Sequence, residues 1–262
     1  MFDVKSIQGN REYMEDYYAF LHQYGITVAM VCDGHGGDTV SKITVQELPQ
    51  KIINKIITVK GTNVKNAIAI REVIMQWADE MKHHKSGSTL TGIVIKNGIL
   101  YVYNLGDSRT VFPLRANSFI YMLKPVFHSG IFKPQILVDY EKTAFFNTID
   151  HDPKNPVEIT RIQGNGGRII GDRLEGVLSL TRAFGDADVK PGTVPDIFWT
   201  KWNNIAGPVL MYSDGLYETE KYNDMQLYKM AVNEGVSALV EKVYKEGSND
   251  NITALLFGVS KK

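Results

Sequence analysis

The sequence predicts an α+β fold built as a layered sandwich, and two observations carry this prediction. The strands come as antiparallel neighbours, most clearly in TLTGIVIKNGILYVYNLGDSR, where two β-rich runs flank Asn97-Gly98, a strong signal for a type I′ hairpin turn. The helical patterns come in long blocks instead of alternating strictly with strands. Such segregation is typical of α+β proteins, whereas strict alternation would favour a parallel sheet.

Each expected element has a pattern of its own. Apolar runs bounded by turn residues predict strands over residues 26–32, 207–215 and 248–259. Apolar residues near a 3.6 period predict helices over residues 39–57, 63–84 and 236–247. Pro49 predicts a kink or a break in the first of these helices, because proline removes a backbone donor. No linker divides the chain, so we expect residues 1–262 to form a single domain.

Composition narrows the function classes. The chain has 29 basic and 29 acidic residues, so nothing favours general attraction to nucleic acid or to an anionic membrane. No stretch reaches the roughly 18 apolar residues that a membrane span needs. The single cysteine, Cys32, cannot form an internal disulfide and fits a reducing compartment. We therefore expect a cytoplasmic monomer that binds neither nucleic acid nor membrane.

Four aspartates stand at the ends of predicted strands: Asp33, Asp107, Asp214 and Asp250. One such residue is ordinary turn chemistry, but several strand ends that meet at one rim would concentrate negative charge there, a state that needs cations or protons. Glu15 and Asp16 are further candidates. No Cys or His pair near them has zinc-ligand spacing, and oxygen-only ligands favour Mg²⁺ or Mn²⁺.

Two such ions would suit phosphoryl chemistry, which also needs a cation that grips phosphate and an acid that protonates the leaving alkoxide. Arg11 suits the first task, because a guanidinium offers a bidentate fork. His35 suits the second, because VCDGHGG places it two residues after Asp33. The alternatives are an Arg11 salt bridge to Glu15 or Asp16, and a structural role for His35.

The motifs GNREYMED, VCDGHGG, SGSTLTG, NLGDSR, TIDHDP, RIQGNGGRI, GVLSLTRAFGD, YSDGL and GSNDNIT occur in this order between residues 9 and 253. Together they resemble the metal-dependent serine/threonine protein phosphatases of the PPM or PP2C type. The resemblance implies a central β-sandwich of two antiparallel sheets flanked by pairs of helices. It also implies hydrolysis of phosphoserine and phosphothreonine by a water held between two Mg²⁺ or Mn²⁺ ions.

The same resemblance implies a role for each matching residue. Asp33 would bridge the two ions, the carbonyl of Gly34 would bind one of them, and Asp214 and Asp250 would complete the other shell. Glu15 would act through water, and Asp16 would support the site. Arg11 matches the phosphate-binding arginine and His35 the general acid. Asp107 matches a ligand of a third, weaker ion, for which this chain carries Glu218 where SDGxxD is usual. We interpret His151 and Arg182 as residues that hold loops together near the cleft.

The chain departs from the family pattern in two segments. Residues 113–147 form a long insertion rich in Phe, Tyr and Pro, whereas the flap at about residues 187–207 is short. The insertion is either a surface hairpin without a role or a docking segment beside the cleft that replaces part of the flap. Two alternative functions also stay open, namely an inactive PP2C-like binding module and a phosphatase of small phosphoesters. The metal-binding aspartates favour an enzyme.

Overall fold

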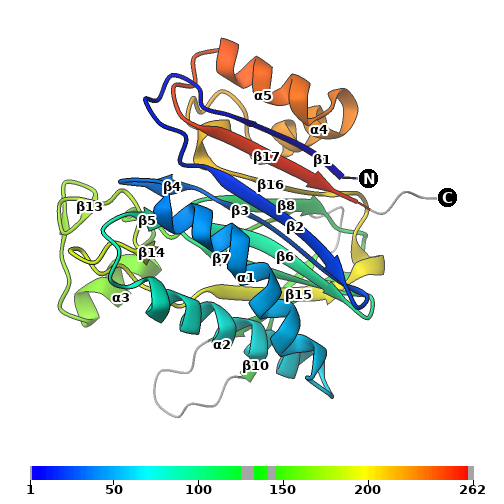
Figure 1. Cartoon of the computed structure of the whole chain (residues 1–262). Helices are drawn as coiled ribbons and strands as arrows, with labels where there is room; N and C mark the ends of the chain where they lie inside the picture. Colours follow the sequence, from blue (N-terminus) through cyan, green and yellow to red (C-terminus); the bar gives the residue numbers. More distant parts are fainter. Residues whose placement is uncertain (1, 125–132, 141–144, 259–262) are drawn as a thin grey trace.

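The computed structural model describes residues 2–124, 133–140 and 145–258, and in that part of the chain two antiparallel sheets pack face to face between helices (Figure 1). The larger sheet has seven strands among these residues, in the order β10 (Lys133–Tyr140), β9 (Ser118–Lys124), β15 (Asp196–Lys201), β7 (Ile99–Leu105), β6 (Leu90–Lys96), β3 (Ile26–Cys32) and β2 (Tyr17–Gln23). The described part of the smaller sheet has five, in the order β1 (Phe2–Ile7), β17 (Ile252–Phe257), β16 (Val209–Tyr212), β8 (Arg109–Pro113) and β11 (Phe145–Asn147). The predicted α+β sandwich is confirmed.

Three apolar layers hold the sandwich together. Helices α1 (Thr39–Ile57) and α2 (Asn63–Met81) cover the outer face of the seven-stranded sheet, where Trp77 is buried. Helices α4 (Asp224–Glu234) and α5 (Val236–Lys245) cover the outer face of the other sheet. The layer between the sheets contains stacked Phe112 and Phe146. None of the described helices is long and apolar enough to cross a lipid bilayer.

The predicted hairpin and helices are present with small changes at their ends. Asn97 and Gly98 both have positive φ, 52° and 71°, as a type I′ turn requires. Of the kink or break predicted at Pro49, the break is wrong, because α1 runs through this residue without interruption. Pro49 is buried, as are Leu48 and Ile52 of the same helix, so apolar burial outweighs the loss of one backbone hydrogen bond.

The segment of residues 113–147 mainly extends the sheets. β9 pairs with β15 and β10 with β9, which adds two strands to the edge of the larger sheet, while β11 pairs with β8 in the smaller one. Thr200 donates a hydrogen bond to the carbonyl of Phe119 across this junction. The segment is therefore built into the sandwich, and its residues 125–132 and 141–144 lie outside the described part of the chain.

Short elements gather at one end of the sandwich (left in Figure 1), near the ends of β3 and β7. They are the small sheet of β4 (Gly34–His35), β5 (Gly87–Ser88) and β14 (Phe184–Gly185), the hairpin of β12 (Ile169–Ile170) and β13 (Arg173–Leu174), and α3 (Pro156–Gly164). The expected flap at 187–207 is a short loop followed by β15 and the 3₁₀ helix η1 (Trp202–Asn204). This end of the molecule carries the glycine- and aspartate-containing turns picked out from the sequence.

Candidate active site

A cavity of about 320 Å³ opens at this end of the sandwich. Its lining residues come from strand ends, the DGHGG turn and the segment after β13. They are Arg11, Glu15, Asp33, Gly34, His35, Gly36, Thr89, Asp107, Arg173, Val177, Leu178, Ser179, Leu180, Asp214 and Asp250. The cavity thus brings together eight of the nine residues selected from the sequence, and the ninth, Asp16, is buried behind it.

The topology explains why the aspartates meet. Asp33 follows β3 and Asp107 follows β7 in the larger sheet, whereas Asp214 follows β16 and Asp250 precedes β17 in the smaller one. Neighbouring antiparallel strands place the end of one beside the start of the next, so all four positions fall at one rim of the sandwich. The expected convergence is confirmed.

At two positions of the rim, backbone segments approach each other so closely that only glycine fits. A Cβ atom on Gly34 would lie 2.6 Å from the carbonyl oxygen of Glu15, and the Gly34 N–H donates to that same oxygen at 3.2 Å. Gly215, next to Asp214, packs against the carbonyl of Asn251, again with no space for a side chain. Glycine is needed at both positions because neighbouring backbone segments approach there too closely to leave space for a side chain.

The clustered carboxylates perturb one another. Burial and the neighbouring charge of Asp214 raise the pKa of Asp33 well above its usual range. Burial and the charge of Asp214 do the same to the pKa of Asp107. The pKa of Asp214 is raised by burial and by Asp250, against a hydrogen bond with Asp33. The rim therefore favours bound protons or cations.

Asp16 is the most enclosed member of this group. Its carboxylate accepts the Ser213 hydroxyl at 2.7 Å, while its Oδ1 has no hydrogen-bond partner among the described residues. Burial raises the pKa of Asp16 to about 7, against hydrogen bonds from Ser213 and Thr253. Glu15 has a structural contact as well, because its Oε1 accepts the Gly37 N–H at 2.5 Å and so braces the DGHGG turn.

Arg11 enters the cavity from the loop after β1. Its Nη2 lies 2.5 Å from Oδ2 of Asp250, and more than half of its side chain is exposed. The salt-bridge alternative to Glu15 or Asp16 is not the pairing found, since the partner is Asp250. An exposed guanidinium at the mouth of an acidic cavity is free to turn toward an incoming anion.

His35 pairs with a residue that sequence reasoning missed. Its Nε2 lies 2.9 and 2.8 Å from the two carboxylate oxygens of Asp186, which is 5% exposed. Asp186 belongs to the RAFGD motif and has a positive φ of 53°. The carboxylate fixes the imidazole plane and accepts the hydrogen bond of the Nε2–H group, which leaves Nδ1 for other chemistry.

Could this rim hold metal ions? No three Asp, Glu, His or Cys side chains of the described residues enclose one ion by themselves. The donor set is nevertheless all oxygen, shares buried charge, and includes the unpartnered Oδ1 of Asp16. Mg²⁺ and similar hard ions keep several waters and take one or two carboxylates, so the residues fit such ions.

Comparison with known proteins supports the phosphatase resemblance of the sequence motifs. The family model described as Protein phosphatase 2C matches residues 1–252. The chain belongs to the PP2C family of protein serine/threonine phosphatases. Its similarity to individual members is distant but extends over most of the chain.

Among the curated relatives, the chain is 28% identical over 298 residues to the human integrin-linked kinase-associated serine/threonine phosphatase 2C, covering 97% of this chain and 71% of that protein. It is 31% identical over 209 residues to bovine protein phosphatase 1A, covering 72% of this chain and 47% of the relative. This PP2C chain therefore spans less than half of the bovine protein.

Solved structures show the same fold. A serine-threonine phosphatase 2C from Toxoplasma gondii aligns with a TM-score of 0.72 at 20% identity, over 98% of this chain and 94% of that one. A Caenorhabditis elegans sex determining protein aligns with a TM-score of 0.74 at 21% identity, over 98% of this chain and 64% of that one.

The remaining wall of the cavity lies outside the insertion and the flap. None of the described residues of 113–147, and none of 187–207, lines the cavity, and a docking role of the insertion beside the cleft stays a prediction. The wall consists of Arg173 and residues 177–180, which follow the β12–β13 hairpin. The repeated glycines of RIQGNGGRIIGD were the signal for a projecting hairpin here.

Thr89 and Glu218 stabilise the loops that carry the site residues. Thr89 of the SGST motif links both sheet ends, since its hydroxyl contacts the Asp33 N–H at 3.0 Å and the Ser108 hydroxyl at 2.7 Å. Glu218 does not line the cavity. Its Oε2 accepts the Ser248 hydroxyl at 2.9 Å and the Asn249 N–H at 3.1 Å, which ties down the loop that carries Asp250.

Proposed function

We propose that this PP2C-family chain hydrolyses phosphoserine and phosphothreonine in proteins and requires Mg²⁺ or Mn²⁺. The observation that carries the proposal is the convergence of Asp33, Asp107, Asp214 and Asp250 in one cavity, where burial and neighbouring negative charge raise the pKa of the first three. Keeping such charges together costs stability, so the arrangement is best explained by cations that neutralise it.

Each carboxylate has a proposed place. Asp33 and the carbonyl of Gly34, with Asp214 and Asp250, would hold two ions; Glu15 and Asp16 would support them, and Asp107 would hold a third, weaker one. When bound, the ions lower the pKa of a water and stabilise the oxygens of the phosphoryl group.

Two residues handle the substrate. Arg11 turns from Asp250 to grip the phosphate through its guanidinium fork, which its exposure permits. His35, oriented at Nε2 by Asp186, holds a proton at Nδ1 and gives it to the departing serine or threonine alkoxide. The contact with Asp186 supports the acid role of His35 over a purely structural role.

The direct test is phosphate release from a panel of phosphopeptides with Mn²⁺, repeated in excess EDTA. We expect release with Mn²⁺ and its loss in EDTA, with recovery when Mn²⁺ is restored. Full activity in EDTA contradicts the metal requirement. No release from any peptide under saturating Mn²⁺ favours the inactive binding module, and a higher kcat/KM for small phosphoesters than for every phosphopeptide favours the third alternative.

The proposal extends to the oligomeric state, the compartment and the partners of the enzyme. We propose a single domain that works as a monomer in the cytoplasm on phosphoprotein substrates, without binding nucleic acid or membranes. Its lone cysteine, Cys32, is free and buried, which suits a reducing compartment. Sedimentation velocity of the purified protein tests the monomer, and a concentration-dependent dimer contradicts it.

A further inference from the structure

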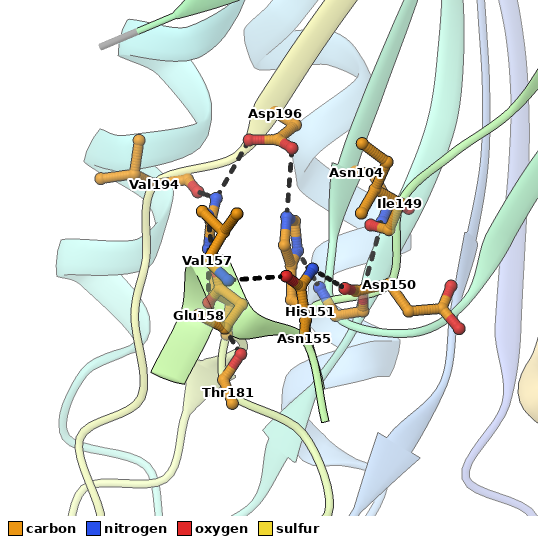
Figure 2. Close-up of polar contacts among 12 residues, drawn as sticks. Asn104, Ile149, Asp150, His151, Asn155, Val157, Glu158, Thr181, Val194 and Asp196 are labelled. Atoms are coloured by element: carbon orange, nitrogen blue, oxygen red, sulfur yellow. Dashed lines mark hydrogen bonds and ion pairs between the residues drawn. The ribbon is translucent and has the colours of Figure 1, made fainter. Parts of the chain in front are cut away.

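A buried polar network lies behind the cavity, between α3, β15 and the loop that follows β7 (Figure 2). Its acidic members are Glu158 and Asp196, and its cations are Arg161 and Arg182. His151, 1% exposed, lies in the middle and points its ring at Asp196. None of these five residues lines the cavity. Their role is therefore to be sought in the backbone segments that they hold in place.

His151 holds Gly106 from two sides. The Gly106 N–H donates to Nδ1 of the imidazole at 3.0 Å, and the Gly106 carbonyl accepts the backbone N–H of His151 at 3.0 Å. The His151 carbonyl in turn accepts the Thr181 N–H at 2.8 Å, which ties this pair to the segment that walls the cavity. A single residue thus joins both sides of the site.

Gly106 has little freedom to move within this clamp. It has a φ of +103°, and a Cβ atom there would lie 2.8 Å from the Thr89 methyl group. The residue that follows is Asp107, which lines the acidic cavity. Where Gly106 is fixed, the backbone that delivers the Asp107 carboxylate is fixed too.

The contact with Gly106 also dictates where the imidazole carries its proton. Because Nδ1 accepts a hydrogen bond, it cannot itself be protonated, and the ring proton belongs on Nε2. Nε2 lies 3.3 Å from Oδ2 of Asp196 and has no regular hydrogen-bond partner among the described residues, so this carboxylate is the acceptor within reach. The other oxygen of Asp196 accepts Nη1 of Arg182 at 3.1 Å, so Asp196 presents an acceptor to the Nε2 proton.

We propose that His151 is a positioning residue for the metal site: it clamps Gly106 and thereby places Asp107, and Asp196 selects the ring tautomer that the clamp needs. The proposal depends on the proposed function only in taking Asp107 as a ligand. Partners behind metal ligands commonly act this way, and their loss typically costs about 10–100-fold in metal affinity or activity.

Two substitutions of His151 separate positioning from mere packing. His151→Asn puts an amide oxygen where the imidazole has Nδ1, so it keeps an acceptor for Gly106. His151→Gln reaches toward Asp196 but leaves the Gly106 N–H without its acceptor. Glutamine is larger than asparagine and closer to histidine in volume, so a residue that only fills space would tolerate His151→Gln better than His151→Asn, the reverse of the order expected here.

Asp196→Asn tests the tautomer without touching the imidazole. The new amide has one oxygen, and Arg182, which only donates, draws that oxygen to itself. The amide N–H₂ then faces Nε2, which must accept, so the ring proton moves to Nδ1 and opposes the Gly106 N–H. We therefore expect this variant to behave like His151→Gln.

The measurements are amide hydrogen exchange at Gly106, ¹⁵N NMR of the His151 ring, and calorimetric titration of the metal-free protein with Mn²⁺. We expect an Nε2 proton in the wild type, an Nδ1 proton in Asp196→Asn, and faster Gly106 exchange in Asp196→Asn and His151→Gln alone. The affinity for the weaker third Mn²⁺ ion, which Asp107 would hold, should fall by about 10–100-fold in those two variants and stay near the wild-type value in His151→Asn.

An Nδ1 proton in the wild type, or equal effects of His151→Asn and His151→Gln, overturns the proposal. If the His151 variants do not fold, the ring spectra of the wild type and Asp196→Asn decide it. A wild type that releases no phosphate and binds no Mn²⁺ refutes the proposed function instead, and the exchange rate of Gly106 then still decides whether His151 clamps it.

Discussion

Replacing Glu158 with glutamine should remove a large part of the stability of the fold. Glu158 is 1% exposed and accepts hydrogen bonds from Arg161 at 2.7 Å, from the Thr181 hydroxyl at 2.8 Å and from Arg182 at 3.0 Å. Burial by itself would raise the pKa of Glu158, but the bonds from Arg182 and Arg161 lower it from 4.5 to about 2. At about 1.4 kcal/mol per pKa unit, this fall corresponds to roughly 3 kcal/mol of stability at neutral pH.

The direction of the pKa shift determines how the stabilisation by Glu158 changes with pH. Because the folded pKa lies below the unfolded one, the stabilisation is complete above about pH 5 and is lost as the pH falls toward 2. By pH 3 the same linkage leaves about 1.4 kcal/mol, less than half of the neutral value. Glu158→Gln should therefore differ most from the wild type at pH 7 and much less at pH 3.

The assay is urea unfolding of wild type and variant at pH 7, 5, 4 and 3. Glu241→Gln is the matched control, since Glu241 makes an exposed pair with Lys245 at 3.9 Å and should change stability by less than about 0.5 kcal/mol. A loss below about 1 kcal/mol at pH 7, or a difference that stays constant down to pH 3, refutes the reasoning.

Three other substitutions probe the site and its frame. Asp250→Asn should lower phosphopeptide turnover by more than about 100-fold, because losing even a partner behind a metal ligand typically lowers metal affinity or activity by about 10–100-fold. Near wild-type rates at saturating Mn²⁺ would show that Asp250 is not a ligand. His35→Gln should lower kcat by about 10²–10⁴-fold on phosphoserine and far less on an aryl phosphate, whose leaving group needs no proton; equal losses on both would mean that His35 is not the acid. Gly215→Ala should destabilise the fold by about 1–3 kcal/mol in urea, since its Cβ would overlap the Asn251 carbonyl, whereas Gly164→Ala, with open space around it, should not; equal stability of the two variants would contradict the close packing of the rim.

The sequence predicted the site better than its surroundings because motif residues lie next to recognisable strand ends. Asp33 and Asp214 each follow an apolar run, and that local pattern was enough to place them at a rim. The partner of His35 was missed because Asp186 is 151 residues away in the chain, and no spacing rule links the two. Only the pairing of β4 with β5 and of β5 with β14 brings them together.

Two helices were missed although their start signals were present. Asn155-Pro156 begins α3 with an asparagine cap and a proline in the first turn, and Asn223 and Gln226 form a capping box at α4. Both helices are short, so a 3.6-residue period has little length in which to show itself. Two roles stayed open for the 113–147 segment, because aromatic residues that pack between sheets look the same in sequence as those that form a docking surface.

The pairing of β1 with β17 has a consequence for how this protein is made. Residues 2–7 form an edge strand whose neighbour in the sheet is residues 252–257, and Arg11 meets Asp250 across the same separation. During synthesis the first strand must wait, without that neighbour, until residues 252–257 have been translated. Contacts between such distant segments form slowly because a long loop must close first. A fragment that ends before residue 250 lacks both the partner strand of β1 and the carboxylate of Asp250, so one truncation removes an edge of the sheet and a member of the acidic rim together.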